Sequence, residues 1–213
     1  MDKIIYTKFD KGAISALPRE LFGGRIFVIT TSAEAQKAVD YLLSQTILGI
    51  DTETRPSFKK GHTNTVSLLQ ISTHDTCFLF RLNLIGITDA LKKLLEDTTV
   101  PKIGLSLHDD IMSLHKRADF VPGNFIDLQD HVSELGIEDL SLQKIYANFF
   151  HKKISKSAQL TNWDADVLTE RQKLYAATDA WACIMIYEEL CRLEDTGDYK
   201  LIVKDKEEKP YNV

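Results

Sequence analysis

The strongest constraint on the fold is a short apolar run that ends in two acidic residues, LGIDTE at 48–53. The apolar residues 48–50 predict the end of a buried strand. Alternate residues of a strand share a face, so Asp51 and Glu53 would point the same way from a core element. Two like charges held side by side repel each other, so at neutral pH one takes up a proton or the pair is pushed apart. The second charge therefore needs a function.

Predicted strands and helices alternate along the rest of the chain, and this order indicates an α/β sheet. His74 and Asp75 lie between two strand-like runs, which predicts a hairpin. Thr169 and Gln172 have capping-box spacing at the start of the last long helix. The expected strands are 25–30, 46–53, 65–73, 76–80 and 102–106, and the expected helices are 32–44 (capped by Ser32), 87–97, one from about 110, 141–150 and 170–193.

The length of 213 residues suits one sizeable domain or at most two small ones. We expect an N-terminal extension over 1–24, a catalytic domain over 25–195 and a charged C-terminal tail over 196–213. The last residues, DKEEKPYNV at 205–213, are expected to be frayed.

Composition excludes several classes of protein. No apolar run is long enough to cross a bilayer, and the first residues lack a signal-peptide pattern, so we expect no membrane association. Cys77, Cys183 and Cys191 have no disulfide-like or metal-like spacing, which favours reduced packing residues and an intracellular protein, cytoplasmic or, in a eukaryote, nuclear. The net charge of −5 argues against a general duplex-DNA coat protein.

The last predicted helix carries an acidic residue on its apolar face. Tyr175 and Asp179 are four residues apart and share a stripe with Ala182, Ile186 and Leu190. Because that stripe should face the core, Asp179 needs a cationic or hydrogen-bonding partner. A lone Asp at such a place is more often paired with Arg or with the helix dipole.

A third acidic signal is the pair Asp109–Asp110, at a predicted strand-to-helix junction where an Asp is most often an N-cap. Each signal is weak alone, but four carboxylates gathered in one place would be unstable without cations. They are the hard oxygen ligands that Mg²⁺ or Mn²⁺ prefers. Two such ions, roughly 3.5–4 Å apart, suit a phosphoryl displacement.

These motifs together resemble the DEDD superfamily of 3′–5′ exonucleases, in the branch with tyrosine in its third motif. The likeness is greatest to the exonuclease domain of the Werner syndrome protein, with ribonuclease D more distant. It covers roughly 25–195, and its most specific segment is TNWDADVLTERQKLYAATDAWACIMIY. Asp51 and Glu53 match the first motif, Asp110 the second, and Tyr175 and Asp179 the third.

The resemblance implies a ribonuclease-H-like fold, a mixed sheet with helices on both sides. It implies an enzyme that hydrolyses the terminal phosphodiester of nucleic acid, DNA being favoured over RNA, by a two-metal-ion mechanism with Mg²⁺ or Mn²⁺. Nucleoside 5′-monophosphates would be released from a free 3′ end. Tyr175 would orient the attacking water, and the backbone at Thr52 and the side chain of Glu53 would hold the 3′-hydroxyl. Met112 is a candidate contact for the last base, with ordinary helix packing at least as common a role.

Two other functions compete with this one. The run ILGIDTET also resembles the aspartyl-phosphate motif of haloacid-dehalogenase-type phosphatases, but those enzymes require Asp where this chain has Glu53, and Tyr175 and Asp179 would have no role. A non-catalytic nucleic-acid-binding module on the same fold is the second alternative, and such a module has no reason to keep four crowded carboxylates. The sequence leaves a helicase or repair partner open.

Trp163 is expected in the core, and Lys156 lies in a polar loop where contact with phosphate competes with simple solvation.

Overall fold

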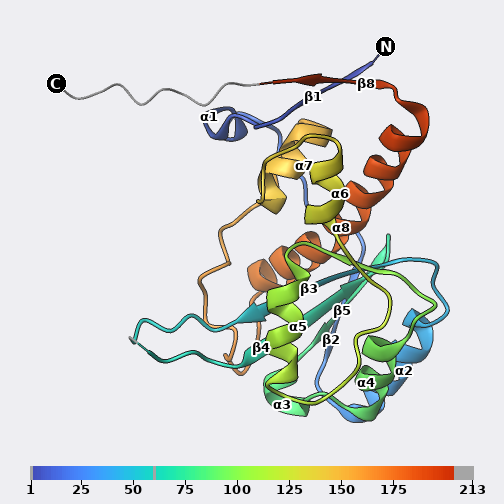
Figure 1. The fold of residues 1–213 in the computed structure, drawn as a ribbon. Coiled ribbons are helices and arrows are strands. Elements are labelled where there is room, and N and C mark those ends of the chain that lie inside the picture. Colours follow the sequence, from blue (N-terminus) through green and yellow to red (C-terminus); the bar gives the residue numbers. More distant parts are fainter. Residues whose placement is uncertain (1, 60, 204–213) are drawn as a thin grey trace.

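The computed structural model describes residues 2–59 and 61–203, and its centre is a six-stranded mixed sheet. The strand order is β2-β5-β4-β3-β6-β7, with helices on both faces (Figure 1). A separate two-stranded sheet joins β1 to β8. The strands are β1 Lys3–Tyr6, β2 Arg25–Ile29, β3 Leu48–Thr54, β4 Val66–Ser72, β5 Thr76–Phe80, β6 Lys102–Gly104, β7 Phe125–Asp127 and β8 Tyr199–Ile202. The helices are α1 Lys11–Ile14, α2 Ser32–Leu42, α3 Leu82–Ile85, α4 Asp89–Glu96, α5 Leu107–His115, α6 Leu128–Glu134, α7 Leu142–Phe150 and α8 Glu170–Thr196.

The mixed sheet follows from the strand connections that the sequence predicts. The short turn at His74–Asp75 joins β4 and β5 as an antiparallel hairpin, and β3 pairs antiparallel with β4. On its other side β3 pairs parallel with β6, and the chain between these two strands contains the β4–β5 hairpin and the helices α3 and α4. The α/β fold class, a mixed sheet covered by helices on both sides, is confirmed.

The central strands alternate their side chains between two cores, which decides where the acidic residues point. Leu48 and Ile50 of β3 lie in the core beneath α2 and α4. The intervening positions, beginning at Gly49, face α8 on the opposite side of the sheet. Asp51 and Glu53 continue this second row, so the period of the strand directs both carboxylates toward α8.

Several predicted boundaries are wrong by a few residues, and the helix near Asp110 is the one that matters. α5 begins at Leu107 rather than at about Asp110, so Asp110 lies in its first turn and is not the N-cap. The cap is supplied from outside the helix: Asp127 accepts hydrogen bonds from the backbone N–H of Ser106 (3.0 Å) and of Leu107 (2.7 Å). Ser106 itself adopts left-handed backbone angles (φ 61°, ψ 39°).

Smaller differences occur elsewhere. Thr31, and not Ser32, caps α2, with Glu34 completing a capping box. The capping box of Thr169 and Gln172 is confirmed, and α8 continues to Thr196. The expected frayed end, 205–213, lies outside the described residues. Within 2–59 and 61–203 no helix has both the length and the apolarity that a membrane span requires.

Within the described residues, the expected N-terminal extension and the first part of the expected C-terminal tail each contribute one strand to a shared two-stranded sheet. β1 and β8 pair in parallel, from Lys3 opposite Tyr199 to Tyr6 opposite Ile202. Ile5 is fully buried in the core that also contains Leu190 and Leu193 of α8. The division at residues 24 and 195 stays a prediction, but both flanking segments contain ordered strands.

The close approach of β3 to α8 depends on Gly49. A Cβ atom added there would lie 1.9 Å from the carbonyl oxygen of Ala180. Gly49→Ala should therefore push the strand away from the helix and lower the free energy of unfolding by about 1–3 kcal/mol, the usual cost of overpacking. Thermal unfolding followed by circular dichroism measures this, and Gly23→Ala, where a Cβ has open space, is the matched control. Equal melting temperatures for the two variants would contradict the close contact.

Candidate active site

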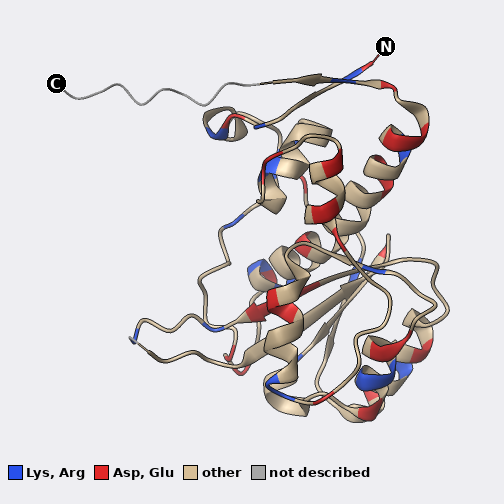
Figure 2. Cartoon of the chain, in the orientation of Figure 1, with Lys and Arg blue, Asp and Glu red and all other residues tan. Residues whose placement is uncertain are grey.

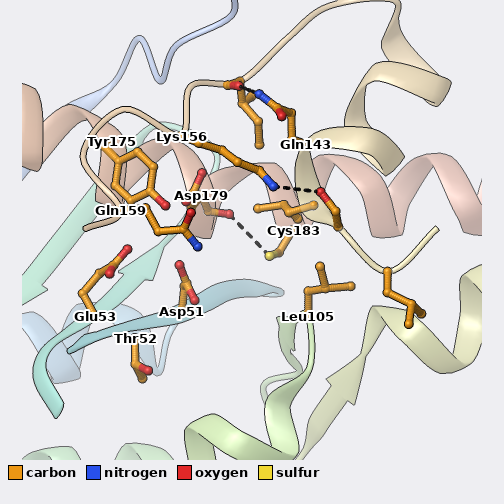
Figure 3. Close-up of a pocket in the computed structure, with 14 residues that line it drawn as sticks. Asp51, Thr52, Glu53, Leu105, Gln143, Lys156, Gln159, Tyr175, Asp179 and Cys183 are labelled. Atoms are coloured by element: carbon orange, nitrogen blue, oxygen red, sulfur yellow. Dashed lines mark hydrogen bonds between the residues drawn. The ribbon is translucent and has the colours of Figure 1, made fainter. Parts of the chain in front are cut away.

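Three carboxylates converge where β3 crosses α8. Asp51 and Glu53 come from the α8-facing row of β3, and Asp179 comes from the third turn of α8 (Figure 3). Carboxylate oxygens of the three residues all lie within 4.8 Å of one another. Glu53 and Asp179 are buried, with 7 % and 8 % of their surface exposed. The sequence predicted this convergence from spacing, and the crossing of strand and helix produces it.

Asp110 lies beside this trio but is not part of its tightest grouping. Its carboxylate accepts a hydrogen bond from the hydroxyl of Thr52, which places the first turn of α5 against β3. The acidic segments of β3 and α5 lie side by side in Figure 2. His108 and Asp109 are exposed on the same helix. The geometry thus brings Asp110, rather than Asp109, to the predicted site.

Burial and mutual repulsion disfavour the charged forms of these carboxylates. Desolvation, then the charges of Asp110 and Asp179, raise the pKa of Asp51 well above its ordinary range. Desolvation and the charge of Asp51 raise the pKa of Glu53 to about 10. Desolvation raises the pKa of Asp179 to about 7, although the Tyr175 hydrogen bond and the charge of Lys156 oppose that shift. Without a cation, the cluster therefore retains protons at neutral pH.

Tyr175 stands one helical turn before Asp179, and its hydroxyl is hydrogen-bonded to that carboxylate. Desolvation and the neighbouring charges of Asp179 and Glu53 raise the pKa of the Tyr175 phenol far above its ordinary value. Its ring contacts Trp163, with centroids 6.0 Å apart, and Trp163 is fully buried as predicted. Tyr175 is therefore a fixed neutral phenol at the edge of the carboxylates.

The site opens into a cavity of about 330 Å³, bounded by β3, α8, the start of α7 and the loop before α8. Lys156 is the cationic side chain of this lining; its ammonium group donates a hydrogen bond to Ser141 Oγ (3.2 Å). Gln143, Gln159 and Cys183 also line the cavity (Figure 3). Met112, the candidate base contact, is not among the lining residues and is 52 % exposed on α5.

Gln70 is a residue that the sequence argument missed. It is fully buried on β4 directly opposite Asp51, and its amide nitrogen lies 3.5 Å from Asp51 Oδ2. Its amide oxygen has no hydrogen-bond partner among the described residues. A polar amide in the middle of the apolar run VSLLQIS was the available signal, because a buried amide needs partners.

The donor set fits a hard divalent cation. All the converging atoms are carboxylate oxygens. No ion pair among the described residues neutralises any of the four acidic residues of the site, which are Asp51, Glu53, Asp110 and Asp179. Buried carboxylates without a paired cation are costly, and oxygen-only sites suit Mg²⁺ or Mn²⁺ rather than thiophilic metals. The residues present therefore match a divalent-metal centre.

Comparison with known proteins gives one consistent result. The family model described as 3'-5' exonuclease matches residues 26–193. The mouse protein "Bifunctional 3'-5' exonuclease/ATP-dependent helicase WRN" is 32 % identical over 170 residues, which are 77 % of this chain and 12 % of that protein. A 3'-5' exonuclease of Arabidopsis thaliana is 29 % identical over 194 residues, 84 % of this chain and 67 % of that protein.

The fold has relatives among solved structures. Escherichia coli RNase D superposes with a TM-score of 0.71 at 24 % identity, over 81 % of this chain and 46 % of that one. The predicted likeness, stronger to the Werner-type exonuclease than to ribonuclease D, is confirmed: ribonuclease D of Haemophilus influenzae is 26 % identical over 163 residues, against 32 % over 170 residues for the mouse protein. The chain spans only a small part of the mouse relative, so that protein's further activities are not carried over.

The raised pKa values predict an unusual dependence of stability on pH. In the metal-free protein, folded Glu53 and Asp179 hold protons that the unfolded chain releases, so the free energy of unfolding should fall as pH rises from about 4 through about 7 and on toward about 10. Melting temperatures in EDTA at pH 5.5 and 8.5 measure this. Glu53→Gln should flatten the decline and raise the melting temperature at pH 8.5, and Mn²⁺ should stabilise the wild type more than this variant.

Asp119→Asn, a change at an exposed carboxylate, is the control and should leave the slope unchanged. If the melting temperature of Glu53→Gln depends on pH as steeply as that of the wild type, the pKa of Glu53 is not raised in the folded protein.

Proposed function

Because this chain belongs to the 3′–5′ exonuclease family, we propose that it hydrolyses the terminal phosphodiester of nucleic acid from a free 3′ end and releases nucleoside 5′-monophosphates. One observation carries the proposal: the oxygens of Asp51, Glu53 and Asp179 lie within 4.8 Å of one another, and the cavity they line is also lined by Tyr175. A phosphatase of the haloacid-dehalogenase type leaves Tyr175 and Asp179 without a role, and the family match speaks against it.

The metal ligands are assigned by position. Asp51, Glu53 and Asp179, with Asp110 at the side of the cluster, would hold two Mg²⁺ or Mn²⁺ ions. Such ions, when bound, supply Lewis acidity that activates water and neutralises charge on the reacting phosphate. The carboxylates contribute the anionic cage, and its raised pKa values mean that cation binding must displace protons.

Tyr175 is assigned the role of orienting the attacking water. Its phenol stays protonated because its pKa is raised, so it can donate or accept a hydrogen bond but is a poor general base. The backbone at Thr52 and the carboxylate of Glu53, which line the same cavity, would hold the terminal 3′-hydroxyl. The side chain of Thr52 is already engaged with Asp110, so the role at the substrate falls to its backbone.

DNA is the substrate we favour, and RNA is the second candidate. The support for DNA is the higher identity to the Werner-type exonuclease, 32 %, than to ribonuclease D, 26 %. A separate helicase or repair partner is compatible with this assignment, since the mouse relative carries an exonuclease and a helicase in one protein.

The direct test is a digestion assay on three 5′-labelled substrates in parallel. They are a single DNA strand, a DNA duplex with a 3′ overhang, and an RNA strand. With Mn²⁺ the products should shorten one nucleotide at a time from the 3′ end, and EDTA should abolish the reaction. A 3′-phosphorylated strand is the control and should resist. Immediate release of the 5′ label as a mononucleotide, or full activity after exhaustive chelation, would contradict the proposal.

The assignment of the second motif is tested by a pair of isosteric variants. Asp110→Asn should lower single-turnover cleavage by about 10²–10³-fold, because it removes one carboxylate of the proposed metal site, on which electrostatic stabilisation of the reacting phosphate would depend. Asp109→Asn, on the exposed face of the same helix, should cleave at close to the wild-type rate. The opposite result would shift the motif by one residue.

A further inference from the structure

We propose that residues 18–22 and the start of α8 form a second groove, beside the active site, which binds the sugar–phosphate backbone of the strand being digested. This inference rests on the proposed exonuclease function and adds a substrate track to it. The segment lies before residue 26, where the family match begins. The groove therefore has one wall that the matched domain does not supply.

The segment is fixed in place by backbone hydrogen bonds. Lys153 N–H donates to Pro18 O (2.9 Å), and Glu20 N–H donates to Lys153 O (2.9 Å), so Arg19 lies in a parallel bridge with Lys153. Two residues later the backbone N–H of Phe22 donates to Thr178 Oγ1 of α8 (3.1 Å). The segment is thus held to the loop before α8 at one point and to α8 itself at another.

Between these attachments lies a cavity of about 580 Å³. Its lining includes Arg19 and Leu21 of this segment, Ser157 of the loop before α8, and Arg171 and Leu174 of α8. Tyr175 lines this cavity and the catalytic cavity alike. Because the two cavities share Tyr175 as a lining residue, they lie next to each other, and under this proposal a strand whose 3′ end is at the carboxylates would continue past Tyr175 into this groove.

The charges in the groove suit phosphate. No described residue forms an ion pair or a side-chain hydrogen bond with Arg19, which is exposed. Arg171 is oriented by Ser157, to which it donates from Nε to Oγ (3.0 Å) and from Nη2 to the carbonyl oxygen (2.7 Å). The one carboxylate in the lining, Glu170, is paired with Lys173 at 2.7 Å.

Two arginines without a carboxylate partner therefore face one groove in a protein whose net charge is −5. Guanidinium groups bind phosphate oxygens in a planar, bidentate geometry, and the apolar Leu21 and Leu174 offer a surface to sugar or base. Cationic side chains matter here, because the neighbouring catalytic cluster repels phosphates unless cations are bound. The arginines would hold the nucleotides that precede the 3′ end, while the 3′ end itself lies at the carboxylates.

The test compares substrates that do and do not reach the groove. A dinucleotide occupies only the catalytic cavity, whereas a single-stranded 12-mer extends past Tyr175. Arg19→Ala and Arg171→Ala should raise KM for the 12-mer several-fold with kcat unchanged, and should leave both constants for the dinucleotide unaltered. Lys37→Ala, a change at an exposed lysine on α2, is the matched control.

Binding provides a readout that does not depend on catalysis. Fluorescence anisotropy of a labelled 12-mer, measured in EDTA over a salt series, should give a slope of log affinity against log salt that is shallower by about 0.7 for each arginine removed. Arg19→Glu should weaken binding further. If Arg171→Ala melts early because it loses Ser157, Arg19→Ala decides the matter, since Arg19 makes no described side-chain contact.

The outcomes separate the two proposals. Wild-type KM and salt slope in Arg19→Ala overturn the groove while the exonuclease assignment stands. Equal losses on dinucleotide and 12-mer also overturn it, because they indicate action at the scissile phosphate or on the fold. If the wild type digests neither substrate, the proposed function fails, and the anisotropy series then decides the groove by itself: a shallower slope in the variants supports it, and an unchanged slope refutes it.

Discussion

The contact between Gly49 of β3 and the carbonyl of Ala180 in α8 governs the geometry of the site. Because no side chain separates the strand from the helix there, the next α8-facing positions of β3 are brought to within a few ångströms of the third turn of α8. Asp51 and Glu53 are then packed against Asp179 whether or not their charges allow it. The hydrophobic burial on both faces of the sheet forces the carboxylates together, and desolvation, followed by their mutual repulsion, raises their pKa values.

The same arrangement destabilises the folded protein and creates the site. Either protonation or a bound cation relieves the repulsion between the carboxylates, and both act at the same oxygens. The protein therefore has a site that is preorganised by its core and completed by what it binds. Lys156 and Tyr175 favour the charged form of Asp179, but the pKa of Asp179 remains raised.

Much of this could be predicted from the sequence, for identifiable reasons. The period-2 pattern of β3 and the four-residue spacing of Tyr175 and Asp179 are local, so they fixed which faces the site residues occupy. The start of α5 was misplaced because its cap, Asp127, lies twenty residues further along the chain. The role of Gln70 and the position of residues 18–22 were missed for the same reason, since each depends on a partner distant in sequence. The β1–β8 pairing joins opposite ends of the described chain, and the few weakly patterned residues involved give no local signal.

The side chain of Asp127 joins the beginnings of two helices, which are also linked by a hydrogen bond from Gln129 Nε2 to Ser106 Oγ (2.6 Å). One oxygen accepts from the N–H groups of Ser106 and Gln129, and the other accepts from Leu107, so a single carboxylate anchors the beginnings of both α5 and α6. Those bonds also offset the left-handed conformation of Ser106, which costs roughly 1–2 kcal/mol in a residue other than glycine. The helix that carries Asp110 consequently cannot slide along its axis unless α6 moves with it. A displacement of α6 would therefore be transmitted to the helix that carries Asp110 through Asp127 and through the Gln129–Ser106 hydrogen bond.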